Sequence, residues 1–115
     1  MTGEDPRDGD GVVACLITFP DEETAARVAR ALVEEGLCAC VNLLAQVRSI
    51  YRWQGAVSDD REVMGIAKTT GARVEALRAR VVALHPYEVP EVIALPVVDG
   101  HGPYLDWVRS SVAGG

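Results

Sequence analysis

The fold is indicated most directly by residues 39–69, which read ACVNLLAQVRSIYRWQGAVSDDREVMGIAKT. The first half of this stretch, residues 39–53, is rich in β-branched and aromatic residues and contains neither proline nor glycine, which is typical of a strand. Fifteen residues are many for one strand, so we expect a bend or bulge near Ala45 and Gln46. The segment therefore predicts one long strand with an irregularity near its middle.

A turn and a returning strand follow this long strand. Residues 54–58 contain Gly55 and supply the turn, and residues 62–69 regain the character of a strand. The two strands together predict a long β-hairpin. Its many apolar side chains have to be buried against something, which predicts self-association through the hairpin.

A strand and an amphipathic helix precede the hairpin. Residues 12–19 form a nearly continuous apolar run, as expected for a buried strand. Asp21 is a good N-cap, and Gly36 supplies the C-terminal end of the helix. Between them, apolar residues recur at helical spacing: Ala25, Val28, Ala29, Leu32 and Val33.

A helix, a strand and a final helix follow the hairpin. Residues 72–84 carry a single apolar stripe, and the prolines that come next prevent the helix from continuing. Residues 92–98 read as a strand in which Pro96 marks an end or an edge, and residues 104–112 read as a short helix.

The element order is therefore β-α-β-β-α-β with an added C-terminal helix. This order predicts an α+β, ferredoxin-like sandwich in a single domain over residues 12–113, with two helices on one face of an antiparallel sheet. The other face of the sheet would be left open in a monomer, which again favours an oligomer.

Length and charge narrow the classes of function. The chain has 115 residues and a net charge of −6, and residues 1–11 carry four carboxylates against Arg7, which predicts a flexible acidic tail. A mildly acidic body argues against nucleic-acid binding. No apolar run approaches the roughly 18 residues of a membrane span, and no signal-peptide pattern is present, so we expect a cytoplasmic protein.

The densest group of chemically active side chains lies in HPYEVPE, residues 85–91. An imidazole, a phenol and two carboxylates are held in seven residues that two prolines make stiff. Loops of this kind on a rigid scaffold often carry binding groups. A rigid turn with solvated polar groups explains the same composition, and the residues alone leave both interpretations open.

A second group lies in the hairpin. Ser49, Tyr51 and Trp53 share one face of the strand, and Ile50 and Arg52 share the other. Tyr51 and Trp53 could line a ligand cleft, although packing in a core or an interface is the commoner role of such a pair.

The thiols and the single lysine are weaker candidates. Cys38 and Cys40 would face the same way on a strand and could hold a soft metal, but free cysteines are more often buried, as we expect for Cys15. Lys68 lies on the same strand face as Glu62, where it would form an ion pair or contact an anion. Phosphate-binding loops and nucleophilic triads are missing from the sequence, so we expect no enzyme.

Several motifs, taken together, resemble the CutA divalent-cation tolerance proteins. They occur in that family's order and spacing over residues 12–112: Cys40-Val41-Asn42, Ser49-Ile50-Tyr51-Arg52-Trp53-Gln54-Gly55, Glu62 with Lys68-Thr69, the segment 85–91, and Tyr104-Leu105-Asp106-Trp107. The resemblance implies a ferredoxin-like homotrimer in the cytoplasm, association with copper and other divalent metals, no established enzymatic activity, and a likeness to PII signalling proteins.

Of the copper ligands that the resemblance implies, this chain keeps one. Ile17 and Leu84 stand where the family's best-known bacterial member has a cysteine and a histidine, and only His85 matches.

Two hypotheses follow from the resemblance and the residues. The first is a trimeric metal-binding protein whose ligands come from His85, Glu88, Glu91 and Cys40. The second is a PII-like signalling or scaffold trimer that binds a small anionic ligand or a protein partner in a cleft between subunits. That cleft would be lined by the remaining candidates: Tyr51, Trp53, Glu62, Lys68 and Tyr87.

Overall fold

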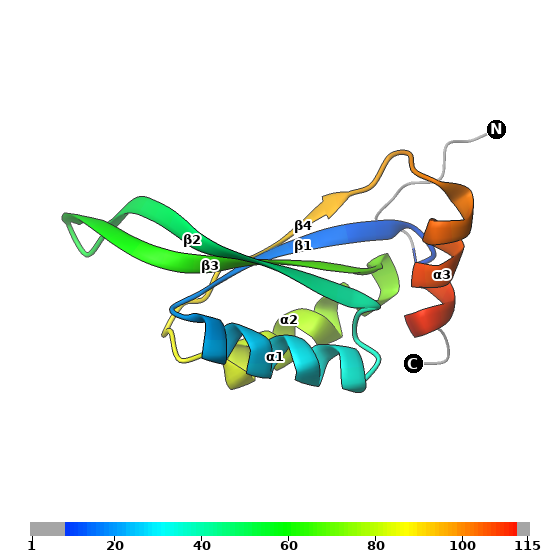
Figure 1. Ribbon diagram of the computed structural model, residues 1–115, viewed down its shortest axis with the longest axis horizontal. Coiled ribbons are helices and arrows are strands. Elements are labelled where there is room, and N and C mark those ends of the chain that lie inside the picture. The colour runs from blue at the N-terminus through cyan, green and yellow to red at the C-terminus, as the bar shows by residue number, and fades with distance from the viewer. Residues whose placement is uncertain (1–8, 113–115) are drawn as a thin grey trace.

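The computed structural model describes residues 9–112, which form one four-stranded antiparallel sheet with helices on one of its faces (Figure 1). The strands lie in the order β2-β3-β1-β4. The α+β, ferredoxin-like arrangement predicted from the sequence is confirmed. Along the chain the elements are β1 (Val12–Phe19), α1 (Glu22–Glu34), β2 (Cys40–Trp53), β3 (Ala56–Thr70), the 3₁₀ turn η1 (Gly71–Arg73), α2 (Val74–Leu84), β4 (Val92–Pro96) and α3 (Gly102–Val112).

Helix α1 begins and ends where the sequence predicted. The Asp21 carboxylate accepts a hydrogen bond from the Thr24 N–H at 2.7 Å, which satisfies one of the free donors of the first turn. Val28 and Leu32 are fully buried against the sheet. The chain leaves the helix at Gly36, whose φ is +72°.

The core lies between the sheet and the two helices α1 and α2. Leu77 and Val81 of α2 are fully buried, and partly buried Val74 and Leu84 complete the stripe that the sequence predicted. Helix α3 lies at the end of the sheet, where Val108 packs with Val12 in a second, smaller cluster (Figure 1). None of the helices in the described part of the chain is long and apolar enough to cross a membrane.

The hairpin of β2 and β3 projects well beyond the rest of the sheet (Figure 1). Its turn has only two residues, Gln54 and Gly55, with φ of +50° and +83°, a conformation that glycine adopts without strain. The prediction that the return strand starts at residue 62 was therefore wrong by six residues. Residues 56–58 were predicted to belong to the turn, and residues 59–61 carry charges that gave no strand signal. In a projecting hairpin most of these side chains are exposed to solvent, so the strand needs no apolar pattern.

The irregularity predicted near Ala45 and Gln46 is confirmed. The pairing of β2 with β3 shifts between Leu44 and Val47, and Gln46 has a φ of +63°. One extra residue in β2 is a β-bulge, which increases the local twist and redirects the outer part of the hairpin.

The ends of the chain and of β4 differ in detail from the prediction. Strand β4 ends at Pro96 instead of residue 98, and α3 begins two residues earlier than expected. Residues 1–8 of the predicted acidic tail, and position 113 of the predicted domain, lie outside the described residues. The carbonyl oxygens of Gly9 and Gly11 accept hydrogen bonds from Ala72 and Gly71, so this part of the predicted tail is held against η1.

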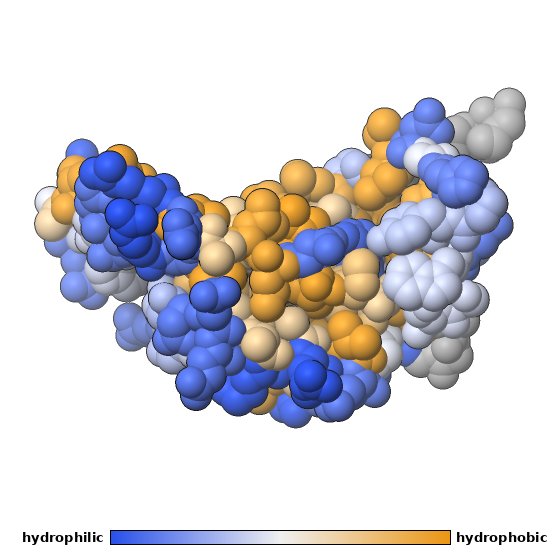
Figure 2. Space-filling view, viewed as in Figure 1, coloured by the Kyte–Doolittle hydropathy of each residue, from blue (hydrophilic) through white to orange (hydrophobic). Residues whose placement is uncertain are grey.

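The sheet face opposite α1 and α2 carries apolar side chains that the chain itself does not cover. Leu44, Ile93 and Leu95 are exposed, and Met64 and Ile66 between them are half-buried. Figure 2 shows apolar residues gathered across the middle of the molecule, between the hairpin end and α3. We refer to these five residues as the open face.

Gly65 provides a test of the packing inside the sheet. A Cβ atom at this position would come within 3.0 Å of Phe19 Cε2, and Phe19 is fully buried. We expect Gly65→Ala to lower the free energy of unfolding by about 1–3 kcal/mol, because a packed ring has to move. Gly102→Ala is the control, since a Cβ there meets no atom within 4 Å. Equal urea midpoints for the two variants would contradict this account of the packing.

Candidate functional site: a cleft between the hairpin and residues 85–91

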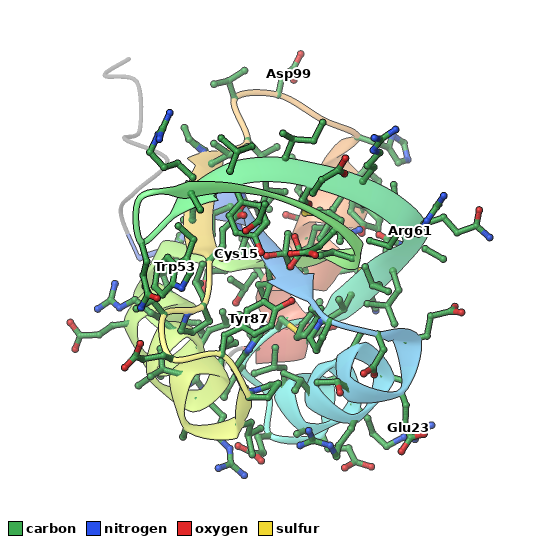
Figure 3. All side chains as sticks on the ribbon, turned by 90° about the vertical axis from the view of Figure 1, so that its left-hand side faces the viewer. Cys15, Glu23, Trp53, Arg61, Tyr87 and Asp99 are labelled. Atoms are coloured by element: carbon green, nitrogen blue, oxygen red, sulfur yellow. The ribbon has the colours of Figure 1, made fainter. Side chains whose placement is uncertain are left out.

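A cleft of about 830 Å³ lies between the projecting hairpin and residues 85–91. It forms because β1 ends at Phe19, opposite Val63, whereas β3 and β2 continue outward past that point. The lining combines aromatic, acidic and apolar residues: Tyr51, Trp53, Tyr87, Glu62, Glu88, Glu91, Thr18, Arg48, Ser49, Ile50, Pro86 and Val89. In Figure 3, which looks onto the hairpin end, Trp53 lies at the left of the hairpin and Tyr87 below its middle, whereas Arg61 lies at the right.

A phenol–carboxylate hydrogen bond joins the two walls of the cleft. The Tyr87 hydroxyl donates to Glu62 Oε2 at 2.7 Å, and Glu62 is only 8% exposed. Partial burial and this hydrogen bond raise the pKa of Tyr87 well above its usual value. The bond fixes residues 85–91 against β3 and satisfies a carboxylate that is largely removed from water.

His85, the first residue of the segment 85–91, has a buried side chain that is 8% exposed. Its Nδ1 accepts the Tyr87 N–H at 3.1 Å, so Nε2 carries the proton and donates to the Thr18 carbonyl oxygen at 2.7 Å. The ring stacks on Phe19 with a centroid distance of 5.3 Å and contacts the Tyr87 ring at 4.7 Å. Both ring nitrogens are therefore engaged, and His85 would have to give up one of these bonds to ligate a metal.

On the hairpin side, Tyr51 donates a hydrogen bond to Asp60 at 2.5 Å, which raises the pKa of the Tyr51 phenol. Arg48 forms a two-point ion pair with Asp59, with distances of 2.9 and 2.7 Å. The pair raises the pKa of Arg48 and lowers that of Asp59. The only basic side chain of the lining is thus already paired with an acid.

The structure brings together most of the candidate residues, but not all of them. Glu88 and Glu91 of the proposed metal set line the cleft, and so do the hairpin aromatic residues. Cys40 lies elsewhere, opposite Lys68 on the two strands, with its Sγ 3.6 Å from the Tyr104 hydroxyl. Among residues 9–112, no three His, Cys, Asp or Glu side chains are placed to hold one metal ion.

Lys68 is not part of the cleft. Its ammonium group donates to the Asn42 side-chain oxygen on the neighbouring strand, while Glu62 binds Tyr87. Six residues of extended chain separate Glu62 from Lys68 by roughly 20 Å, so the ion pair predicted between them does not form.

Cys38 and Cys40, which the sequence placed on one strand face, lie in different environments. Cys38 precedes β2, so strand alternation does not apply to it, and its side chain is buried in the main core with that of Cys15. Burial raises the pKa of Cys38 to about 12 and that of Cys15 to about 11, which keeps both thiols protonated. The expectation that Cys15 is a core residue is confirmed.

Two residues of the site were missed from the sequence. Asp60 holds Tyr51, and Arg48 lines the cleft beside its partner Asp59. Both acids lie between residues 54–58, which were predicted to be the turn, and residues 62–69, which were predicted to be the strand. Extending the alternation of the return strand back to the two-residue turn at Gln54 and Gly55 would have placed Asp60 on the face of Tyr51.

The comparison with known proteins agrees with the motifs. The sequence profile of the family described as "CutA1 divalent ion tolerance protein" matches residues 13–111. The chain belongs to this family. A divalent-cation tolerance protein CutA of Thermus thermophilus is 53% identical over 96 residues, which cover 84% of this chain and 93% of that protein. The human protein CutA is 52% identical over 98 residues, which cover 85% of this chain but only 55% of the human protein.

Solved structures of CutA1 proteins have the same fold. The structure of the Thermus thermophilus protein is similar with a TM-score of 0.86 at 50% identity, covering 89% of this chain and 99% of that one. The CutA1 structure from Oryza sativa gives a TM-score of 0.87 at 38% identity, covering 90% and 95%. The family is named for tolerance of divalent ions and not for a reaction.

Removing the Tyr87 hydroxyl tests the bond that closes this cleft. Tyr87→Phe leaves the Glu62 carboxylate, largely withdrawn from water, without the donor that Tyr87 supplies, so we expect the free energy of unfolding to fall by about 1–3 kcal/mol. Tyr51→Phe is the matched control. Asp60 is exposed to water, which can replace the lost phenol hydrogen bond, so we expect little loss of stability. Chemical denaturation measures both variants, and an equal loss in the two would argue against a special role for Glu62.

The tyrosines also predict a dependence on alkaline pH. All three tyrosines have a pKa raised above the ordinary value of 10.0, through hydrogen bonds and burial. Because the fold favours the neutral phenols, their stabilising contribution is complete below pH 10 and is lost as the pH rises through the raised values. Phenolate absorbance should therefore appear at higher pH in the native protein than in the guanidinium-unfolded chain. Coinciding titration curves would contradict the hydrogen bonds described here.

Proposed function

We propose that this protein acts in the tolerance of divalent cations as a cytoplasmic homotrimer that binds copper and other divalent cations and catalyses no reaction. The observation that carries the proposal is that Glu62, Glu88 and Glu91 all line one cleft in a chain of the CutA1 family. Carboxylate oxygens are suitable ligands for divalent cations, and the stiff segment 85–91 holds two of the three.

The homotrimer is supported by the open face and by the hairpin. The five apolar residues of the open face are more than a single chain covers, and contiguous apolar surface of this kind marks an interaction site. Closed symmetric assembly of identical chains is the usual way to bury it. The family resemblance favours three subunits joined through their hairpins.

The metal site is the part of the proposal that depends on assembly. One chain does not place three suitable side chains around a point within residues 9–112, so a second subunit has to complete the set. Glu88 and Glu91 are the first candidates because they are exposed at the cleft. Cys40 would contribute only from a neighbouring subunit, and His85 only after releasing Thr18 or Tyr87.

A second candidate function is a PII-like signalling or scaffold trimer with a small ligand in the cleft. The volume of about 830 Å³ and the exposed rings of Tyr51 and Trp53 favour it, because a bare metal ion requires neither. The lining argues against the anionic ligand that the sequence suggested. Three carboxylates lie there, Lys68 is absent from the lining, and Arg48 is already paired.

Native mass spectrometry of the purified protein, with and without Cu(II), tests the assembly and the metal together. We expect a trimer that takes up copper in a fixed ratio and resists dilution. The double variant Glu88→Gln with Glu91→Gln should bind Cu(II) at least about tenfold more weakly. Glu23→Gln, on the exposed first turn of α1, removes one carboxylate that does not line the cleft and should bind normally.

Each unexpected result would contradict a different part of the proposal. A monomer would remove the basis for any shared site. A trimer that takes up no copper would overturn the metal-binding role and favour the signalling trimer. Equal binding by the double variant and by Glu23→Gln would place the metal outside the cleft, and His85→Ala then shows whether the imidazole holds it.

A further inference from the structure

Three large aromatic side chains remain partly exposed around one hollow. Tyr51, Trp53 and Tyr87 are 41%, 44% and 36% exposed, and all three line the cleft. They come from two separate segments, the end of the hairpin and residues 85–91, and Figure 3 shows Trp53 and Tyr87 below the arch of the hairpin. An open aromatic lining of this kind offers ring surface to a ligand, in addition to metal-binding atoms.

The two tyrosine rings are made richer in electrons by their partners. Tyr87 donates its hydroxyl hydrogen to Glu62, and Tyr51 donates to Asp60. A phenol that donates to a carboxylate gains negative charge on its oxygen and ring, which strengthens the attraction of the ring face for a cation. Both hydroxyl hydrogens are also taken up, so neither is free to bind an anion.

The charges of the lining also favour a cationic ligand. Glu62, Glu88 and Glu91 face one basic residue, Arg48, whose guanidinium is already bound to Asp59. The rest of the lining consists of the apolar side chains of Ile50, Pro86 and Val89 and the two small hydroxyl residues Thr18 and Ser49. The cleft thus combines negative potential with apolar and aromatic walls, a combination that suits a cation covered by hydrocarbon.

We infer that the cleft binds a small organic cation, a trimethylammonium group whose methyl groups pack against Tyr51, Trp53 and Tyr87 while Glu88 and Glu91 balance its charge. A hydrated metal ion would leave the aromatic faces unused. A primary ammonium would direct its three N–H donors to the carboxylates and leave much of the aromatic and apolar lining unused. A trimethylammonium group has no N–H donors, and cation–π contact with several rings is a known way of binding it.

This inference goes beyond cation tolerance and does not depend on copper binding. The same trimethylammonium group occurs in free quaternary ammonium compounds and in proteins with trimethylated lysine. The two sources share their recognition chemistry, and they are distinguished by testing tetramethylammonium and a short peptide with a trimethyllysine as separate ligands.

The test follows the ligand's methyl protons by NMR in the presence of the full-length protein. Protons lying over aromatic faces shift upfield, whereas protons of an ion held only by diffuse charge do not. We expect an upfield shift and line broadening for tetramethylammonium, for the trimethyllysine peptide, or for both. The neutral molecule tert-butanol, similar in size, and the unmethylated peptide should give neither effect.

Matched variants locate the site. Trp53→Leu keeps an apolar side chain but removes the ring, and we expect binding to weaken roughly five- to thirtyfold. Trp107→Leu is the control, because Trp107 is 45% exposed and lies on α3, outside the cleft. The Glu88→Gln and Glu91→Gln double variant should also weaken binding, whereas Glu23→Gln should not.

The inference is overturned if tert-butanol binds as well as tetramethylammonium, because the cleft would then be merely apolar. It is also overturned if Trp53→Leu and Trp107→Leu bind alike, or if the wild-type protein produces no upfield shift with either cationic ligand. The wild-type measurement holds even if Trp53→Leu fails to fold. Loss of tetramethylammonium binding with normal copper uptake in Trp53→Leu would separate this site from the proposed metal function.

Discussion

The hydrogen bond from His85 to the Thr18 carbonyl is the interaction on which the arrangement of the cleft depends. It joins the residue that follows α2 to the end of β1, across 67 positions of sequence. Because His85 also accepts from the Tyr87 N–H, it fixes the backbone direction of the next two residues. Tyr87 can then reach Glu62, and the two walls of the cleft meet. The His85 imidazole therefore has a structural role: its two hydrogen bonds hold the start of the segment 85–91 against the end of β1.

Most of the fold could be predicted because its signals are local. A capping aspartate at position 21, a helical stripe ending at Leu84 and a glycine at the hairpin turn each act within a few residues. The bulge near Gln46 was also predictable, since a strand of that length rarely stays regular. The start of β3 was misjudged because strand pairing, and not burial, holds residues 56–61 in place.

The candidate site was predictable in composition but not in geometry. Stiffness and clustered polar groups drew attention to residues 85–91, most of which line the cleft, and strand alternation grouped Tyr51 with Trp53, which line it too. The role of His85 was not readable, because its partner is a backbone carbonyl that any residue at position 18 would supply. Lys68 was linked to the site through the strand face that it shares with Glu62, and Cys40 through its thiol and the family motif. The sheet register places the two residues opposite each other, and neither lines the cleft.

The unequal burial of the three thiols has a practical consequence. Cys15 and Cys38 are sealed in the core, whereas Cys40 is partly exposed at the start of β2. In a single chain, a maleimide reagent would therefore meet one accessible sulfur. The wild-type sequence already contains a single attachment point for a fluorophore or spin label. It lies on the same sheet face as Lys68, at the opposite end of β2 from the hairpin turn, so distances between labels on different chains would test the proposed trimer.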